Sequence, residues 1–496
     1  MQRKFLTNLL ILLFMNLLIK PFWILGIDRS VQNAVGAEQY GFYFAIFNFT
    51  FLFNILLDFG ITNFNNRNIA QNHQLLQKHF SSIIILKLLL FVFYCIISIG
   101  AGFVIGYDSV QIKMLALLGF NQFLISFILY LRSNISGLHF FKTDSVISVL
   151  DRSLMILICG VLLWGNVTKS PFQIEWFIYA QSVAYILTAI IAFLIVVRKA
   201  KFMKLKWNRP FFFMIIKQSF PFAILVLLMA FYNRIDSVML ERLLPGSQGA
   251  EQAGIYASAY RLLDATNMIA YLFSVILLPM FARMLKFKES VAALTRLSFT
   301  LLFVLSVTVA LSSFFYSTEI MTMLYPQHIN ETLAEFNARI TQTSTIFGLL
   351  MAGFIPISTT YVFGTLLTSN GNLKQLNLVA GCGMVLNISL NFILIPQFLS
   401  VGSAYASLLT QFLTAAVQVI LALHIFKFAA NKIYLLKIVS FVVAVVCFGL
   451  LSRALTLDWK LSILIMGALS VIFVAAIKLL SVKSFFATFR KTTEPA

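Results

Sequence analysis

The chain of 496 residues is 60% hydrophobic and only 11% charged, with a mean hydropathy of +0.92. About a quarter of the residues in a soluble globular domain are charged, so this composition excludes a soluble protein and predicts one embedded in a lipid bilayer. The formal net charge of +20 comes from short basic clusters between apolar runs. That pattern is typical of cytoplasmic loops and argues against nucleic acid as a partner.

The apolar runs are long enough to cross a bilayer, which takes roughly 20 residues each. We count about fourteen of them, and the first has no small-residue cleavage site after it, so we expect a retained span rather than a signal peptide. The sequence therefore predicts an all-α integral membrane protein. The runs cover approximately 5–27, 41–65, 81–106, 112–131, 146–165, 174–197, 211–240, 254–282, 293–316, 339–368, 375–396, 402–426, 434–452 and 461–480.

A motif in the first half of the chain recurs in the second half. Residues 36–43 and 249–256 both read Gly-Ala-Glu-Gln-x-Gly-x-Tyr, and an Ile-Asp pair precedes each copy, at 27–28 and 235–236. Each copy joins two apolar runs, so we expect it to form the outer turn of a helix hairpin. An internal repeat of this length predicts two six-helix lobes related by a pseudo-two-fold axis, plus two C-terminal helices.

These elements divide the chain into four parts. The predicted N-terminal lobe is 1–197, a basic cytoplasmic linker follows at 198–210, the C-terminal lobe is 211–427, and helices thirteen and fourteen with a cytoplasmic tail occupy 428–496. Lys and Arg are concentrated in every second loop, which predicts that both termini are cytoplasmic. In this scheme Arg152 counts among the cytoplasmic charges, and Lys87 lies near the cytoplasmic surface, where its side chain can snorkel.

Ionisable side chains within the predicted spans are few, and such groups usually face a cavity or pair with one another. Lys20, Arg234 and Arg261 fall at similar depth in the outer halves of three spans. A cavity shared by these cations would attract phosphate. The repeat places Asn48 at the position equivalent to Arg261, and Asn54 at the position equivalent to Asn267. We therefore assign Asn48 and Asn267, together with the three cations, to a substrate-binding cationic cavity.

Other readings of these charges remain open. Arg261 and Asp264 are spaced i,i+3 and can instead neutralise each other on one helix face. Asp58 precedes Phe-Gly at the end of the second run. There it either lines the inner part of the pathway or takes up a proton or Na⁺, or it has a structural role: it caps a broken helix or pairs with Arg67. We therefore regard Asp58 and Asp264 as candidates for ion coupling.

The sequence carries no phosphate-binding G-x-x-x-x-G-K-[ST] loop and no cluster of His and Cys with metal spacing. It also lacks a paired acidic motif in an outer loop, which a membrane glycosyltransferase needs for its metal and base. We therefore expect neither catalytic residues nor a metal nor a cofactor.

Several motifs resemble those of bacterial polysaccharide flippases of the O-antigen and capsule (Wzx) type, within the superfamily of multidrug, oligosaccharidyl-lipid and polysaccharide exporters. The resemblance covers essentially the whole chain. It is carried by Asp28 with Gly36-x-x-x-Tyr40-Gly41-x-Tyr43, Leu56-Leu57-Asp58-Phe59-Gly60-Ile61, Pro221, Arg234-Ile235-Asp236-Ser237-Val238-Met239-Leu240, Asn387-x-x-x-Asn391-x-x-Leu394-Ile395-Pro396 and Gly402-Ser403-Ala404-x-Ala406.

The resemblance implies two lobes around a V-shaped cavity in the bacterial cytoplasmic membrane. It implies an undecaprenyl-pyrophosphate-linked oligosaccharide as substrate, moved from the inner to the outer leaflet, with a polymerase and other polysaccharide-assembly proteins as partners. Related lipid flippases carry a charged pair at the outer end of helix one, which corresponds to Asp28 and Arg29. With Asp236, this pair is the expected outer gate.

Two other functions are weighed against this one. A cation-coupled multidrug exporter of the same superfamily would need more acid than base in its cavity, whereas this chain has the reverse. An integral-membrane glycosyltransferase or polymerase would need the acidic outer-loop motif that is missing here.

Overall fold

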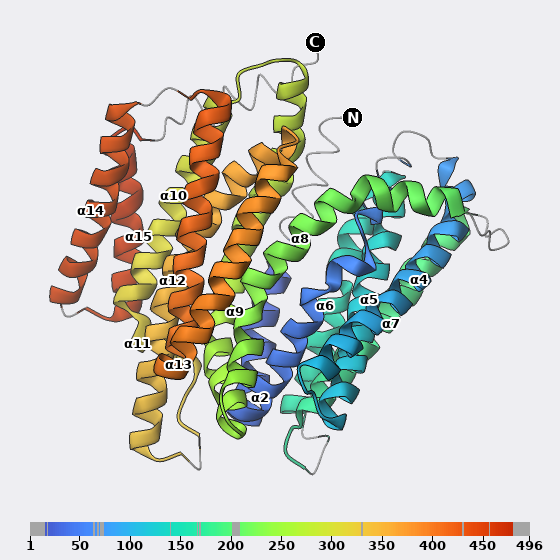
Figure 1. The fold of residues 1–496 in the computed structure, drawn as a ribbon. Coiled ribbons are helices and arrows are strands. Elements are labelled where there is room, and N and C mark those ends of the chain that lie inside the picture. The colour runs from blue at the N-terminus through green and yellow to red at the C-terminus, as the bar shows by residue number, and fades with distance from the viewer. Residues whose placement is uncertain are drawn as a thin grey trace. The chain divides into compact units, whose positions relative to one another are not determined.

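Helices make up the regular structure of the part of the chain that can be described (Figure 1), and no strand occurs among these residues. The computed structural model describes residues 15–479 except 17, 63–64, 67–68, 70–73, 139, 166, 168–169, 201–208, 329–330, 429–430 and 456. The chain divides into two units, Met1–Ala257 and Ser258–Ala496. The predicted all-α fold is confirmed.

The first unit is built on the helices before residue 258. The longest of them pack side by side, with α5 in contact with α2, α4, α6 and α7. They are η1 (Trp23–Asp28), α2 (Arg29–Leu52), η2 (Asn54–Leu57), α4 (Leu75–Val104), α5 (Ser109–Gly137), α6 (Phe141–Trp164), α7 (Ile174–Ala200), α8 (Arg209–Leu243) and the first turns of α9 (Ser247–Lys286).

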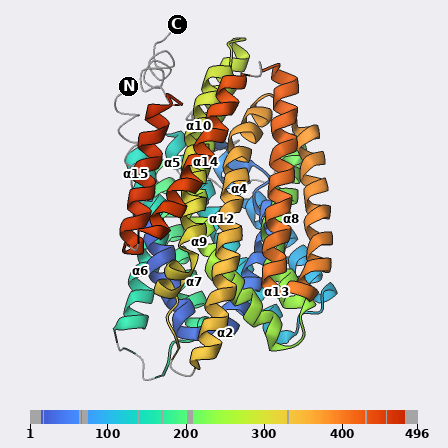
Figure 2. The same ribbon diagram turned by 90° about the vertical axis from the view of Figure 1, so that its left-hand side faces the viewer.

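The second unit contains the rest of α9 and the helices that follow it. Within it α12 packs against α10 and α13, while α14 and α15 lie together against α10 (Figure 2). Val307 of α10, Phe441 and Val445 of α14, and Met466 of α15 are buried in this contact. These helices are α10 (Ala292–Phe315), α11 (Ser317–Leu324), α12 (Leu333–Ser369), α13 (Leu373–Phe426), α14 (Lys432–Ala454) and α15 (Trp459–Ala476).

Among the described residues, 11 helices are long and apolar enough to cross a membrane. The number is smaller than the number of predicted runs for two reasons. The helix α13, with 54 residues, is two helices joined at a kink where Leu399 has a φ of 54°. The first predicted run begins in residues outside the description, and the second is interrupted by the break at 53–60. The protein is a multi-pass membrane protein.

The predicted outer turn of the first repeat is confined to one residue. Helical geometry continues from η1 through α2 except at Gly36, where φ is 83°, a value that favours glycine because it has no Cβ. In the second repeat the turn lies between α8 and α9, where Gly246 has a φ of 56°. The short insertion at 245–246 therefore forms the second turn.

The repeated motif makes a reciprocal contact inside the first unit. A Cβ on Gly41 would lie 1.8 Å from the carbonyl oxygen of Ala250, and a Cβ on Gly254 would lie 1.9 Å from that of Ala37. Since Ala37 and Ala250 are equivalent in the repeat, and Gly41 and Gly254 likewise, the contact is self-complementary, as across a two-fold axis. Small residues four apart allow such close approach of helices in membranes. This contact supports the predicted pseudo-two-fold axis.

Two deviations shape the helices around this axis. The α8 helix bends along its length (Figure 1) and contains Pro221, the usual cause of such a bend. The helix after Gly36 breaks completely: it leaves α-geometry at Phe53, passes through η2, and turns at Phe59 and Gly60, whose φ values are 43° and 78°.

The boundary between the two units falls inside α9, because α8 packs along α2 and so lies in the first unit. The predicted lobes and their linker at 198–210 remain predictions, and residues 201–208 of that linker lie outside the described residues.

The reciprocal contact leads to a first prediction. Gly41→Ala or Gly254→Ala places a methyl group inside a backbone carbonyl, which forces the two helices apart. We expect either variant to lower the amount of folded protein in the membrane about tenfold, since overpacking costs about 1–3 kcal/mol or more. Fluorescence size-exclusion chromatography of detergent extracts measures this amount.

Gly100→Ala is the matched control, because a Cβ at that position would meet nothing within 4 Å. Normal levels of both the Gly41 and Gly254 variants would contradict the reciprocal contact.

Candidate functional site

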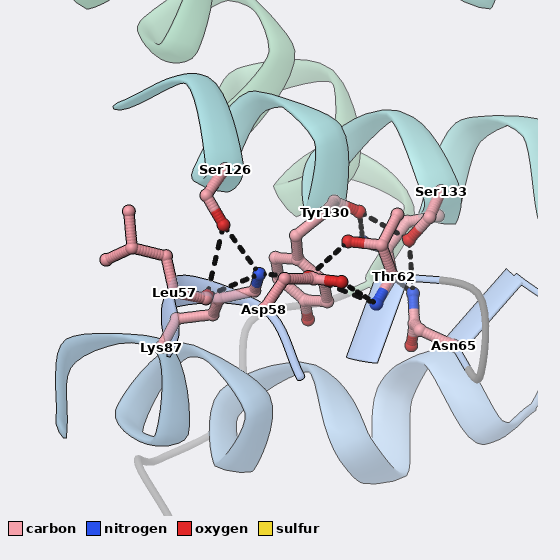
Figure 3. A network of polar contacts seen from close by, with 9 residues as sticks. Leu57, Asp58, Thr62, Asn65, Lys87, Ser126, Tyr130 and Ser133 are labelled. Carbon is pink, nitrogen blue, oxygen red and sulfur yellow. Dashed lines mark hydrogen bonds and ion pairs between the residues drawn. The ribbon is translucent and has the colours of Figure 1, made fainter. Parts of the chain in front are cut away.

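Polar side chains of the first unit gather where the second transmembrane helix is broken (Figure 3). The ammonium group of Lys87, on α4, is fully buried. It donates hydrogen bonds to the carbonyl oxygen of Leu57 at 3.0 Å and to Oγ of Ser126 at 2.9 Å, and it forms an ion pair with the carboxylate of Asp58. Ser126, on α5, also donates to the Leu57 carbonyl at 3.1 Å.

Asp58 has a second role at this break. Its carboxylate accepts hydrogen bonds from the hydroxyl of Thr62 at 2.6 Å and from the Thr62 backbone N–H at 3.3 Å. It therefore caps the helix that resumes after the break, one of the two structural roles considered for it. Its ionic partner is Lys87; Arg67 lies outside the described residues.

The expectation that Lys87 snorkels is wrong. Its side chain is 0% exposed, because the break in the neighbouring helix provides both a carboxylate and a free carbonyl oxygen inside the unit. A lysine with such partners has no need to reach the membrane surface.

A polar stripe on α5 holds the broken helix along its length. Gln122 accepts a hydrogen bond from Asn54 at 2.7 Å and donates one to Thr50 at 3.2 Å. Farther along α5, Ser133 accepts one from Asn65 at 2.9 Å. The stripe was missed by sequence reasoning, although polar residues at helical spacing in an apolar run were its signal.

The structure brings together two residues of the predicted cationic cavity. Asn48 is 2% exposed, donates to Oγ of Ser237 at 2.8 Å and lies 3.5 Å from the Arg234 guanidinium through its amide oxygen. That guanidinium also lies over the ring of Phe51, 5.3 Å from its centroid. Asn48 therefore positions Arg234 rather than offering a free amide.

A second cationic cluster surrounds Arg152, which sequence reasoning assigned to the cytoplasmic side. The structure places Arg152 well inside α6, a candidate membrane span, rather than in a loop. Its guanidinium donates to the Tyr185 hydroxyl at 2.8 Å and stands over the rings of Tyr185 and Trp23, 5.7 Å from each centroid. Asp151 is 4.0 Å away, and Lys20 is close enough to interact electrostatically with both charges.

About a quarter of the Arg152 side chain, 26%, is exposed. The signal in the sequence was the Asp-Arg pair inside the apolar run 146–165.

The predicted gate carboxylates are both buried and both accept from a tyrosine. Asp28 accepts a hydrogen bond from Tyr40, and Asp236 accepts one from Tyr256, each at 2.8 Å. The two aspartates are 2% and 1% exposed. The Nε atom of Arg29 is buried with no hydrogen-bond partner among the described residues.

The end of α8 is tied to the turn between α4 and α5 by a latch of four residues: Tyr107, Gln111, Glu241 and Arg242. The Arg242 guanidinium donates to Glu241 at 2.5 Å, to Gln111 at 2.7 Å and to the carbonyl oxygen of Gly106 at 3.1 Å. It lies 4.5 Å from the centroid of the Tyr107 ring. Gln111 also donates to Glu241 at 2.7 Å.

Burial raises the pKa of the Tyr107 hydroxyl above its ordinary value.

In the second unit, Arg261 and Asp264 lie 3.9 Å apart, a long ion pair at the i,i+3 spacing. The amide oxygen of Asn267 is buried with no hydrogen-bond partner among the described residues. The hairpin of α13 has its own polar pair: Asn391 donates to Asn387 at 3.1 Å and accepts from Ser403 at 2.8 Å. The described residues contain no group of three or more His, Cys, Asp or Glu suited to a metal ion.

Comparison with known proteins gives a family and a fold. The family described as polysaccharide biosynthesis protein matches residues 5–285. No curated protein matches the sequence. Among solved structures, the lipid II flippase MurJ in an inward closed conformation aligns with a TM-score of 0.69 and 14% identity, over 95% of this chain and 98% of MurJ.

Two transporter structures are also similar. An inward-facing multidrug resistance MATE transporter of the MOP superfamily has a TM-score of 0.59 and 13% identity, over 82% of this chain and 94% of its own. A MOP superfamily transporter from Pyrococcus furiosus has a TM-score of 0.57 and 13% identity, over 85% and 94%. At these identities the likeness shows the fold alone: a MurJ- and MATE-like arrangement of helices.

The latch leads to a second prediction. Arg242→Ala removes three hydrogen-bond donors, so we expect the end of α8 to separate from the α4–α5 turn more often. The access is read from a cysteine introduced at Ser237, which is 1% exposed. We expect this cysteine to react about tenfold faster with a membrane-impermeant thiol reagent added from outside, which corresponds to a latch worth about 1.4 kcal/mol.

The measurement uses a background in which the 4 native cysteines are replaced. Lys113→Ala, an exposed cation on α5, is the matched control. Equal labelling rates in the Arg242 variant and the control would show that the latch does not limit access.

Proposed function

Because the chain belongs to the polysaccharide biosynthesis protein family, we propose that it is a flippase for lipid-linked oligosaccharide. The substrate is an undecaprenyl-pyrophosphate-linked repeat unit, carried from the inner to the outer leaflet of the bacterial cytoplasmic membrane. Both termini are cytoplasmic in this proposal, and a polymerase on the outer side receives the product.

The observation that carries the proposal is an excess of cations within membrane-spanning helices. Charged groups are costly there and are retained where they serve a pathway. Arg152 and Arg234 in the first unit, and Arg261 in the second, are half-buried arginines inside spans. Arginine suits a pyrophosphate because its planar fork of donors matches two phosphate oxygens at once.

Most of the acids inside the first unit are held by other partners, and Asp151, at 4.0 Å, is the one that faces Arg152. Asp58 is paired with Lys87, and Asp144 holds Arg132 through two contacts of 2.8 and 3.3 Å. The buried carboxylates of Asp28 and Asp236 each hold a tyrosine. A drug exporter coupled to cation entry needs an available acid, so these pairings favour an anionic substrate.

We further propose how the predicted site residues share the work. Lys20, Arg152, Arg234 and Arg261 bind the pyrophosphate or an acidic sugar, with Asn48 and Asn267 beside them, while the lipid chain stays in the bilayer. Asp28, Arg29 and Asp236 anchor the outer ends of the first and seventh predicted helices where the pathway closes. Asp264 lies beside Arg261 and partly offsets its positive charge. In this proposal Asp264 is also the residue that couples transport to an ion.

A third prediction tests the cationic cavity. Arg261→Ala removes a cation that a neutral side chain cannot replace, so we expect surface polysaccharide to fall at least about tenfold, the effect of losing one charged hydrogen bond. The lipid-linked precursor accumulates inside the cell. Polysaccharide is measured by gel electrophoresis of surface extracts, and the protein by immunoblot of membranes.

Arg283→Ala, at an exposed position on the same helix, is the matched control and retains polysaccharide. Normal polysaccharide in the Arg261 variant contradicts its role in the cavity. Loss of drug resistance with unchanged polysaccharide, after deletion of the whole gene, supports a multidrug exporter instead.

A further inference from the structure

The surroundings of the Lys87 ammonium group have the composition of a metal-cation site. Three oxygens of different kinds surround Nζ: the backbone carbonyl of Leu57, the hydroxyl of Ser126 and the carboxylate of Asp58. Figure 3 shows these groups converging on the nitrogen from the broken helix and from α5. Hard oxygen donors of this kind are those that Na⁺ and similar ions use in proteins.

The break in the helix is what makes the backbone oxygen available. In a continuous helix the Leu57 carbonyl would accept the N–H of Ile61, but that N–H bonds to the Asp58 carbonyl instead, at 2.8 Å. In membrane transporters, discontinuous helices expose carbonyls that coordinate Na⁺ or respond to H⁺. Here the same architecture is present, and the position of the ion is held by a side chain.

We propose that Leu57, Asp58 and Ser126 form a monovalent-cation site that is filled by the tethered ammonium group of Lys87. The covalent link means that this charge cannot leave during a conformational cycle. Without the lysine side chain, the three oxygens take a free Na⁺ or K⁺ in its place. This inference does not depend on the proposed function, because its test reads stability and ion binding rather than transport.

The competing view is that Lys87 and Asp58 form an ordinary buried ion pair. Both views agree that removing the lysine alone leaves Asp58 poorly compensated, which destabilises the protein. They differ in what repairs the damage. If the oxygens form a cation site, a small cation binds there and restores stability. If Lys87 and Asp58 form only an ion pair, the space left by the lysine collapses and a small cation has no effect on stability.

The test uses purified full-length Lys87→Ala in detergent. Its rate of thermal inactivation is measured by size-exclusion chromatography in NaCl, KCl or N-methyl-D-glucamine chloride at one ionic strength. We expect Na⁺ or K⁺ to slow inactivation about tenfold relative to the bulky organic cation, as ligand binding to the folded state requires. The wild-type protein, whose site is already filled, responds equally to all three salts.

Two further variants sharpen the result. Adding Ser126→Ala to Lys87→Ala removes one ligand, so a several-fold higher Na⁺ concentration is needed for the same protection. The charge-free variant Asp58→Asn with Lys87→Met needs no cation and is indifferent to the salt.

Three outcomes would overturn the proposal. The first is equal inactivation of Lys87→Ala in all three salts. The second is absence of Lys87→Ala from membranes while the charge-free variant is present, because the potassium of the cytoplasm would then have failed to fill the site. The third is loss of both variants, which would mean that Lys87 is needed for its packing rather than its charge.

Discussion

A lipid bilayer offers no hydrogen bonds, so each backbone N–H and C=O group within it must find a partner inside the protein. Between Phe53 and Gly60 the second transmembrane helix loses its α-helical geometry and cannot pair all of its own backbone groups. Neighbouring side chains pair with them instead. Lys87 and Ser126 take up the freed Leu57 carbonyl, and Asp58 caps the helix that resumes. The polar stripe on α5 exists for the same reason: it supplies partners where the neighbouring helix cannot supply its own.

The same constraint explains how charge is distributed in the first unit. A charge that serves only the fold is neutralised close to where it lies, as Asp58 is by Lys87 and Asp144 is by Arg132. Arg152 is supported mainly by the Trp23 ring and the Tyr185 hydroxyl, with the Asp151 carboxylate farther away at 4.0 Å. Such support orients a guanidinium without cancelling its charge, which leaves it able to attract an anion.

Sequence alone was sufficient for the features that depend on short stretches of chain. Span lengths follow from hydropathy, and the repeat is readable because its two copies share letters in order. The sequence could not show which helices face each other. For this reason Lys87 was assigned to the membrane surface, although it lies beside Asp58 inside the first unit. Arg152 was counted among the loop charges because the start of α6 lies several residues before the apolar run that marked it. The latch at Arg242 was missed because its partners are more than 100 positions away in sequence, at Gly106 and Gln111.

The reciprocal contact of Gly41 and Gly254 has the geometry of a homodimer whose subunits have been joined into one chain. In a homodimer, one substitution changes both sides of such an interface together. In a fused chain each side changes independently, so one half can acquire Arg261 while the equivalent position in the other half keeps Asn48. Covalent joining thus keeps the close contact of the two glycines while the rest of each half is free to change independently.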